Sequence, residues 1–323
     1  MGRHRQEPEP VPRRLFVIGG LTLLTGAAIG GSIQVLNPDG DQAETTATGP
    51  TPSATTPSST PSATEPSLSP SPAPSTVSSA LRAGPDFARA AAAYDRTRPG
   101  RCGVAGVNLA TGARIAYNEA TTFTSASIVK VGILVALMLQ LDGGMPSSAQ
   151  RSRASRMIKV SDNDAADSHW SDIGRGTGYT RQMKRLGFTD TRAGSGGYWG
   201  ATRTSPRDQN RLLTALQDDA SPVTAEQRAY VLTLMREVDK AQRWGVSAAT
   251  DSDEVWLKNG WLPAQSDNGL WAINSIGRVL LDTGDLALLT VLSGGSPSMG
   301  AGIATVERLA SLAGAALSGR SLA

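Results

Sequence analysis

The distribution of apolar and polar positions divides the chain into four segments. Residues 1–14 are polar and basic, residues 15–36 are uncharged and mostly apolar, and residues 37–79 are rich in Pro, Ser, Thr and Ala. Only residues 80–323 combine apolar and polar positions with the periods of helices and strands. We therefore expect one folded domain at 80–323. A tether at 37–79 precedes it and stays disordered, because it cannot bury enough apolar surface to fold.

Short apolar runs in the first half of this domain predict strands, and a longer run predicts a helix. Gly103–Leu109 and Arg114–Asn118 flank Ala110-Thr111-Gly112 and form a predicted hairpin. The almost wholly apolar stretch Ser127–Leu141 predicts a helix. This stretch is too short to span a membrane, so we expect it to be buried in a core.

The second half of the domain adds amphipathic helices, then strands, then a final helix. Ser205 is a predicted N-cap, because Pro follows it at the first helical position. The predicted elements are helices Pro206–Leu216 and Val223–Val238, strands Glu254–Trp261, Leu270–Leu281 and Leu286–Ser293, and a C-terminal helix with Ile303, Val306, Leu309 and Ala313 on its apolar face. This order predicts an α+β fold, an antiparallel sheet of about five strands flanked by helices and accompanied by a helical subdomain.

The N-terminal segments predict contact with a membrane. About 20 apolar residues suffice to cross a bilayer, and the basic flank stays on the cytoplasmic side. We expect a cytoplasmic basic leader at 1–14 and a signal anchor or export signal at 15–36. The run from Arg13 to Val17 is similar to a twin-arginine export signal. The protein is thus expected in the cell membrane as a single-pass chain with its domain outside the cytoplasm, or secreted. No Cys ends the apolar run, which excludes a lipid anchor there.

Composition narrows the function classes. The formal net charge is +3, and the basic excess lies at the N-terminus, so we expect no nucleic-acid partner. The single cysteine, Cys102, lies in an apolar strand pattern and is expected to be a small buried residue. The only histidines are His4 in the leader and His169 on a predicted helix. They cannot form a zinc site by themselves, so neither metal nor cofactor is expected.

Candidate chemistry lies in three short motifs, each of which has a purely structural alternative. Lys130 closes Ser127-Ile128-Val129-Lys130, where residues three apart share a helix face; the alternative is a Ser N-cap with a solvated Lys. Ser161-Asp162-Asn163 can equally be a turn or cap. Lys258-Asn259-Gly260 can be a hairpin turn, although Pro263 would cut the return strand short. The chain has only five Lys among 31 basic residues. Arg could not replace Lys130 as a base, because its guanidinium does not deprotonate.

The order of these motifs resembles that of serine β-lactamases and penicillin-binding proteins, and the chain is most similar to class A β-lactamase-like serine hydrolases. The resemblance covers about residues 85–318 and includes 184–188 and 204–208, which look like the flanks of the class A Ω-type loop. It implies catalytic roles for Ser127 as nucleophile, Lys130 as base and Ser161 as proton relay. It implies substrate binding by Asn163, Lys258, Asn259 and Gly260, and an oxyanion hole of the Ser127 and Trp261 N–H groups.

Three departures from this family pattern shape the expected function. Position 259 is Asn where the family has Thr or Ser, and the short gap from Ser127 to Ser161 predicts a reduced helical subdomain. No Glu lies between Gly187 and Thr204, where class A enzymes place the residue that activates the deacylating water. Asp190 is the only acid there and is more simply a turn residue, whereas Tyr198 and Trp199 can line the cleft or cover the core.

We therefore expect an exported serine hydrolase that acts on peptidoglycan-type peptides or β-lactams and deacylates β-lactams slowly. One alternative is a class A-like β-lactamase that reaches deacylation by another route. A second alternative is a non-catalytic cell-wall-binding or regulatory module on the same fold.

Overall fold

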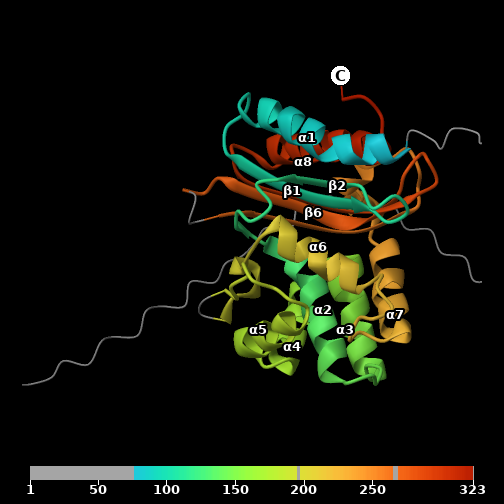
Figure 1. Cartoon of the computed structure of the whole chain (residues 1–323). Coiled ribbons are helices and arrows are strands. Elements are labelled where there is room, and N and C mark those ends of the chain that lie inside the picture. The colour runs from blue at the N-terminus through green and yellow to red at the C-terminus, as the bar shows by residue number, and fades with distance from the viewer. Residues whose placement is uncertain (1–75, 195–196, 265–267, 323) are drawn as a thin grey trace, which may run out of the picture. The chain divides into compact units, whose positions relative to one another are not determined.

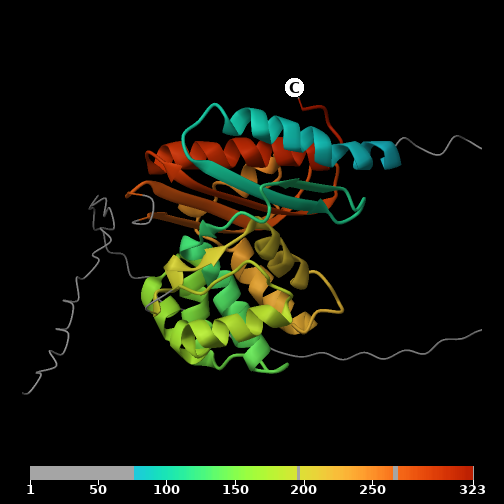
Figure 2. The ribbon, with the colours of Figure 1, turned by 60° about the vertical axis from the view of Figure 1, so that its left-hand side comes forward.

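The structure, a computed structural model, describes residues 76–194, 197–264 and 268–322. These residues form three layers (Figure 1). Helices α1 (Thr76–Asp95) and α8 (Met299–Leu317) lie side by side on one face of a sheet, and the other helices lie beyond its opposite face. The same layers are visible after a turn about the vertical axis (Figure 2). The predicted α+β class is confirmed.

The sheet has five antiparallel strands in the order β2-β1-β7-β6-β5. Their bounds are β1 Arg101–Asn108, β2 Arg114–Tyr117, β5 Val255–Pro263, β6 Trp271–Leu280 and β7 Leu286–Ser296. The predicted hairpin and the three later strands are confirmed. Strand β5 runs straight through Lys258-Asn259-Gly260 to Pro263, so this motif is not a hairpin turn. The motif lies on an edge strand that has β6 on one side only.

The helices on the second face form what we call the helical lobe, α2 to α7. Its members are α2 Val129–Gln140, α3 Ser148–Lys159, α4 Asn163–Asp172, α5 Arg175–Arg185, α6 Pro206–Ala215 and α7 Ala225–Arg236. Every residue of α2 from Val129 to Leu139 is buried, as its apolar sequence predicts. Only α2 and α3 lie between Ser127 and Ser161, which agrees with the short gap in the sequence. Ser205 caps α6 by accepting a hydrogen bond from the Asp208 N–H, as predicted.

Helix α1, like α3 and α5, was not predicted by the sequence analysis. It buries Phe87 and Ala91, which places it against the core. The expected domain start at residue 80 falls inside this helix, and residues 76–79 of the predicted tether are helical. The leader, the apolar segment 15–36 and the rest of the tether lie outside the described residues. Among the helices of the described part, none is both long and apolar enough to cross a bilayer.

Candidate active site

Ser127 lies in the short 3-10 turn η1 (Ala126–Ile128), which leads directly into α2. Ala126 has a φ of +48°, in the left-handed region that non-glycine residues rarely adopt. This turn lifts Ser127 to a half-buried position between the buried Ala126 and Ile128. The helix predicted from Ser127 onward is therefore confirmed, with a 3-10 first turn. Strained backbone at one position is a frequent property of functional sites.

Lys130 projects from the first turn of α2 and is completely buried. Its Nζ donates hydrogen bonds to Ser161 O at 2.6 Å, to Ser161 Oγ at 3.1 Å and to Asn163 Oδ1 at 2.8 Å. The sequence suggested a reach from this amine to Ser127. Within the described residues, however, the amine is directed at Ser161, and no bond joins it to Ser127 Oγ. Catalytic hydrogen bonds of a substrate-free site are often long and tighten when substrate binds.

The Ser161-Asp162-Asn163 motif serves as a helix cap and also assembles the site. Asp162 is the N-cap of α4, and its side chain accepts the Ala165 N–H at 3.0 Å. Ser161 precedes it with a φ of +61°. This backbone turn presents both the carbonyl and the hydroxyl of Ser161 to Lys130. The structural and the functional interpretation of this motif are therefore compatible.

Lys258 approaches the same hydroxyl from strand β5. It is completely buried, and its Nζ donates to Ser161 Oγ at 3.1 Å and to Asn259 O at 3.0 Å. Two amines thus flank a single hydroxyl oxygen. Within the described part of the chain, neither lysine forms an ion pair.

Burial controls the charge of both amines. Desolvation lowers the pKa of Lys130 from 10.5 to about 7, although the negative charges of Asp162 and Asp167 oppose this shift. Desolvation, and then the positive charge of Lys130, lower the pKa of Lys258 well below its ordinary value. Two ammonium groups so close together would repel each other. At neutral pH this site therefore favours at least one neutral amine, which can accept a proton.

Gly260 allows β5 to contact the Ser127 turn. A Cβ at this position would lie 2.7 Å from the backbone nitrogens of Ser127 and Ile128, a distance that side chains cannot adopt. The sequence interpretation assigned this space to a ligand, and the structure corrects it, because the turn itself fills the space. The contact brings the strand that carries Trp261 next to the Ser127 N–H. This is the pair of backbones that the predicted oxyanion hole requires.

Asn259 is not brought to the lysine cluster. Its Nδ2 donates to Gln242 O at 2.7 Å and to Trp244 O at 2.9 Å, so both amide hydrogens are used. The side chain is completely buried. It anchors the segment before β5, and it offers no donor to a substrate carboxylate. The sequence pattern placed Asn259 among the substrate-binding residues, which this geometry does not support.

The sequence left open whether Trp199 lines the cleft or covers the core, and in the structure Trp199 lines the site. Its ring centroid lies 4.6 Å from Lys130 Nζ, and its Nε1 donates to Asp167 Oδ1 at 2.6 Å. Tyr198 is 70% exposed and takes no part. The sequence analysis missed Asp167. Its spacing of four residues from Asn163 on one helix was the available signal, because such residues share a face.

The base of the loop that carries Trp199 is fixed by a buried carboxylate. Asp208 is completely buried and accepts the N–H groups of Thr189, Asp190 and Thr191 at 2.8–3.1 Å. Asp190 pairs with Arg207 at 3.0 Å. It is therefore a structural turn residue, as expected, and its carboxylate is engaged away from the lysines.

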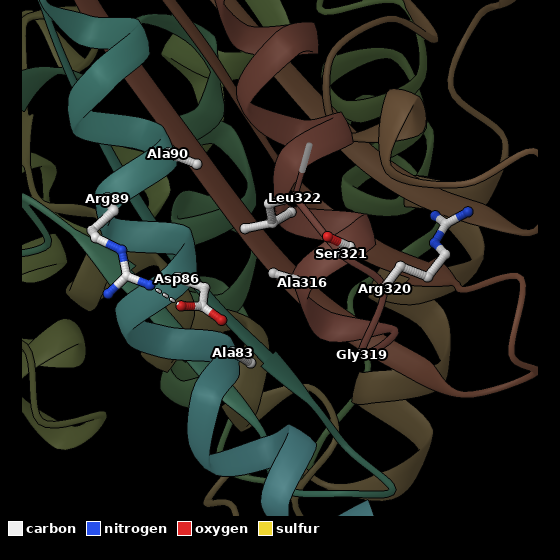
Figure 3. A pocket seen from close by; sticks show the side chains of 9 residues that line it. All are labelled: Ala83, Asp86, Arg89, Ala90, Ala316, Gly319, Arg320, Ser321 and Leu322. Carbon is white, nitrogen blue, oxygen red and sulfur yellow. Dashed lines mark hydrogen bonds and ion pairs between the residues drawn. The ribbon is translucent and has the colours of Figure 1, made fainter.

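Other candidate chemistry in the described residues is sparse. No group of three or more His, Cys, Asp or Glu side chains there could hold a metal ion. Cys102 is buried as predicted, and its Sγ donates to Asp95 Oδ1 at 3.2 Å. His169 is buried in α4, with Nδ1 3.3 Å from Asp172 Oδ2. A hollow of about 640 Å³ between α1 and the end of α8 (Figure 3) contains none of the site residues.

The fold is that of a β-lactamase-like serine hydrolase. The chain belongs to the Beta-lactamase enzyme family, whose model matches residues 86–154 and 151–316. A protein of Mycobacterium bovis described as "Putative lipoprotein LppW" is 26% identical over 167 residues, which cover 49% of this chain and 53% of that protein. The M. tuberculosis protein of the same name matches equally. The chain thus spans about half the length of these curated relatives.

Solved structures show the same fold. A class A β-lactamase representative from Bacteroides cellulosilyticus is similar with a TM-score of 0.62 and 16% identity, over 73% of this chain and 98% of that one. PBP-A is similar with a TM-score of 0.62 and 19% identity, over 72% of this chain and 96% of that one. A PBP-A mutant of the same TM-score was solved as an acyl-enzyme complex with penicillin G. At these identities the likeness establishes the fold alone.

Proposed function

We propose that this protein is an active-site serine enzyme that transfers acyl groups through an ester on Ser127. The observation that most directly supports this proposal is the pair of buried amines, Lys130 and Lys258, that flank Ser161 Oγ beside the Ser127 turn. Buried amines without a carboxylate partner are costly, and structural ion pairing does not account for them. A proton-transfer site does, because it needs an amine that is neutral near neutral pH.

The acylation step follows from this arrangement. Ser127 Oγ bonds to the substrate carbonyl carbon while its proton passes to neutral Lys130. The N–H groups of Ser127 and Trp261 stabilise the oxyanion. When the C–N bond breaks, the departing nitrogen takes the Ser161 hydroxyl proton, which Lys130 replaces. The products are a Ser127 ester and a free amine.

Asn163 and Lys258 are the proposed substrate contacts. The Asn163 Oδ1 is occupied by Lys130, but its amide hydrogens form no bond with another described residue. When protonated, Lys258 has three hydrogens; two are used on Ser161 and on the Asn259 carbonyl, which leaves one for a substrate carboxylate. A substrate with an anionic terminus, such as a peptidoglycan-type peptide or a β-lactam, would stabilise this protonated form of the buried amine.

The deacylation step is proposed to be slow with β-lactams. The Trp199 indole covers the Lys130 amine at 4.6 Å, and the loop around it has no Glu. Asp190 is engaged by Arg207. A water beside the ester therefore lacks a dedicated base. This favours a peptidoglycan-type peptide as the natural substrate and β-lactams as long-lived acylating agents.

A β-lactamase is the second candidate, and one observation favours it. Asp167 is an exposed carboxylate held next to Lys130 by the Trp199 indole, at 2.6 Å from Nε1. If it activated water, hydrolysis would be fast despite the missing Glu.

Mass spectrometry and stopped-flow with a chromogenic cephalosporin test these proposals together. A Ser127 adduct that is absent from Ser127→Ala, with a stoichiometric burst and very slow turnover, supports the acyl-transfer enzyme. Steady hydrolysis at tens per second without a burst promotes the β-lactamase. No adduct with any β-lactam or activated ester would refute an acylating site and leave the non-catalytic module.

We also propose that the domain works outside the cytoplasm, attached through residues 15–36 and the tether 37–79. The support is the composition of these segments and the lipoprotein name of the mycobacterial relatives. The only cysteine of this chain is the buried Cys102, so an apolar anchor replaces a lipidated cysteine here. Protease digestion of intact spheroplasts should remove the domain; complete protection would contradict this orientation.

A further inference from the structure

A basic groove lies on the helical lobe and shares no residue with the lysine cluster. It is a hollow of about 870 Å³ between α5 and the first part of the loop that carries Trp199. Four cationic side chains line it: Arg175, Arg181, Lys184 and Arg192. The hydroxyl residues Thr177 and Thr180 complete its wall along α5.

The cations of this groove have no carboxylate partner, in contrast to other surface arginines, although Arg192 donates to the Thr189 and Thr191 carbonyls. Arg153, Arg207 and Arg236 each pair with a nearby carboxylate. In contrast, no ion pair occurs for any of the groove's four cations within the described part of the chain, and no Asp or Glu lines the hollow. The four cations are exposed. Their positive potential is therefore uncompensated and is available to an anionic ligand.

The form of the groove restricts that ligand. Arg175 and Lys184 lie about 14 Å apart along the axis of α5, so the charges are spread out rather than gathered around a point. The wall has no apolar side chain larger than Ala193, which disfavours a lipid tail, and a hollow does not fit a flat bilayer. Three of the four cations are Arg, whose planar fork binds phosphate oxygens in pairs. Hydroxyl groups add neutral donors for further phosphate oxygens.

We propose that the basic groove binds a linear polyanion that carries phosphate groups. Such a ligand would place the protein on an anionic polymer while the lysine cluster acts on its own substrate. This inference does not depend on the proposed acyl transfer, since the two sites share no residue.

Fluorescence anisotropy with fluorescein-labelled polyphosphate of about 15 units tests the groove, on the full-length protein in a non-ionic detergent. Because the four Arg residues of the basic leader would attract anions as well, every protein compared carries Gln in place of Arg3, Arg5, Arg13 and Arg14. The test variant is Arg181→Gln/Lys184→Gln. The charge-matched control is Arg114→Gln/Arg308→Gln, two exposed residues without a pairing partner in the described part.

Loss of two contacts to an anionic surface should weaken polyphosphate binding about 10- to 30-fold in the test variant. The control should bind within about twofold of the parent, and both should acylate normally. Equal weakening in the test and control variants would overturn the groove as the site. Poly-glutamate of equal charge that binds as tightly as polyphosphate would overturn the phosphate assignment.

Discussion

The pH dependence of the proposed Ser127 acylation should report on the protonation of the buried amine pair, in which Lys130 is the proposed base. Only a neutral amine can accept the hydroxyl proton, because an ammonium group has no acceptor. Burial lowers the pKa of Lys130 from 10.5 to about 7. A base with a pKa of about 7 is about 10% neutral at pH 6 and about 90% neutral at pH 8. The acylation rate should therefore rise about tenfold between these values and level off above about pH 8.

The measurement is single-turnover stopped-flow with a fluorescent penicillin from pH 6 to pH 9, on protein shown by circular dichroism to stay folded. Lys130→Met should lower the plateau rate about 10²–10⁴-fold and remove the inflection. Lys159→Gln is the matched control, because this lysine pairs with Glu237 on the surface at 2.9 Å. It should leave the rate and the inflection unchanged.

Two results would refute this reasoning. A rate that climbs tenfold per unit through pH 9 without a plateau would mean that Lys130 keeps an ordinary pKa. An inflection near pH 7 that persists in Lys130→Met would assign the base to another group. Because two amines share Ser161, the observed value belongs to the Lys130–Lys258 pair rather than to one residue.

Three further substitutions test the surrounding geometry. Gly260→Ala should destabilise the fold by about 1–3 kcal/mol and slow acylation about 10²-fold, because its Cβ would push the Ser127 turn aside. Thermal melts and acylation rates measure these effects, and Gly300→Ala, which has open surroundings, is the control that should leave both unchanged. Unchanged values in Gly260→Ala would contradict the prediction. Trp199→Glu should speed deacylation about 10²-fold by supplying a water-activating carboxylate, as release of the adduct will show; an equal gain in Trp199→Gln would mean that only space was limiting. Asp208→Asn should lower the unfolding free energy by about 1–3 kcal/mol in urea, because an amide cannot accept the loop N–H groups as the carboxylate does; no loss would show that the loop base is not held there.

The elements that the sequence predicted are those whose apolar period is local and strong. The β1–β2 hairpin, helix α2 and strands β5 to β7 fall within a few residues of their predicted ranges. Helix α1 was missed because its core contact depends mainly on Phe87 and Ala91 among many alanines. The interior Gly84-Pro85 also disfavours a helix locally, and the packing against α8 that stabilises α1 is not visible in the local sequence.

The candidate site could also be predicted from the sequence only in part. The motifs predicted that Ser127, Lys130, Ser161 and Lys258 have a common purpose, and the structure places Lys130 and Lys258 on one Ser161 hydroxyl. The direction of the Asn259 side chain and the indole over Lys130 could not be predicted. Both depend on where distant segments pack, and neither leaves a periodic trace in the sequence.

The strand order has a consequence for how the protein is made. Strand β1 pairs with β7, so Val104 lies opposite Val291. The whole helical lobe is inserted in the chain between β2 and β5. Such long-range pairing carries a loop-closure cost and slows folding. A nascent chain cannot complete the sheet until β7 has left the ribosome. Lys258, which comes from β5, therefore meets Ser161 only late in synthesis. If Ser127 is acylated as proposed, its labelling would serve as a readout of completed folding for the entire domain.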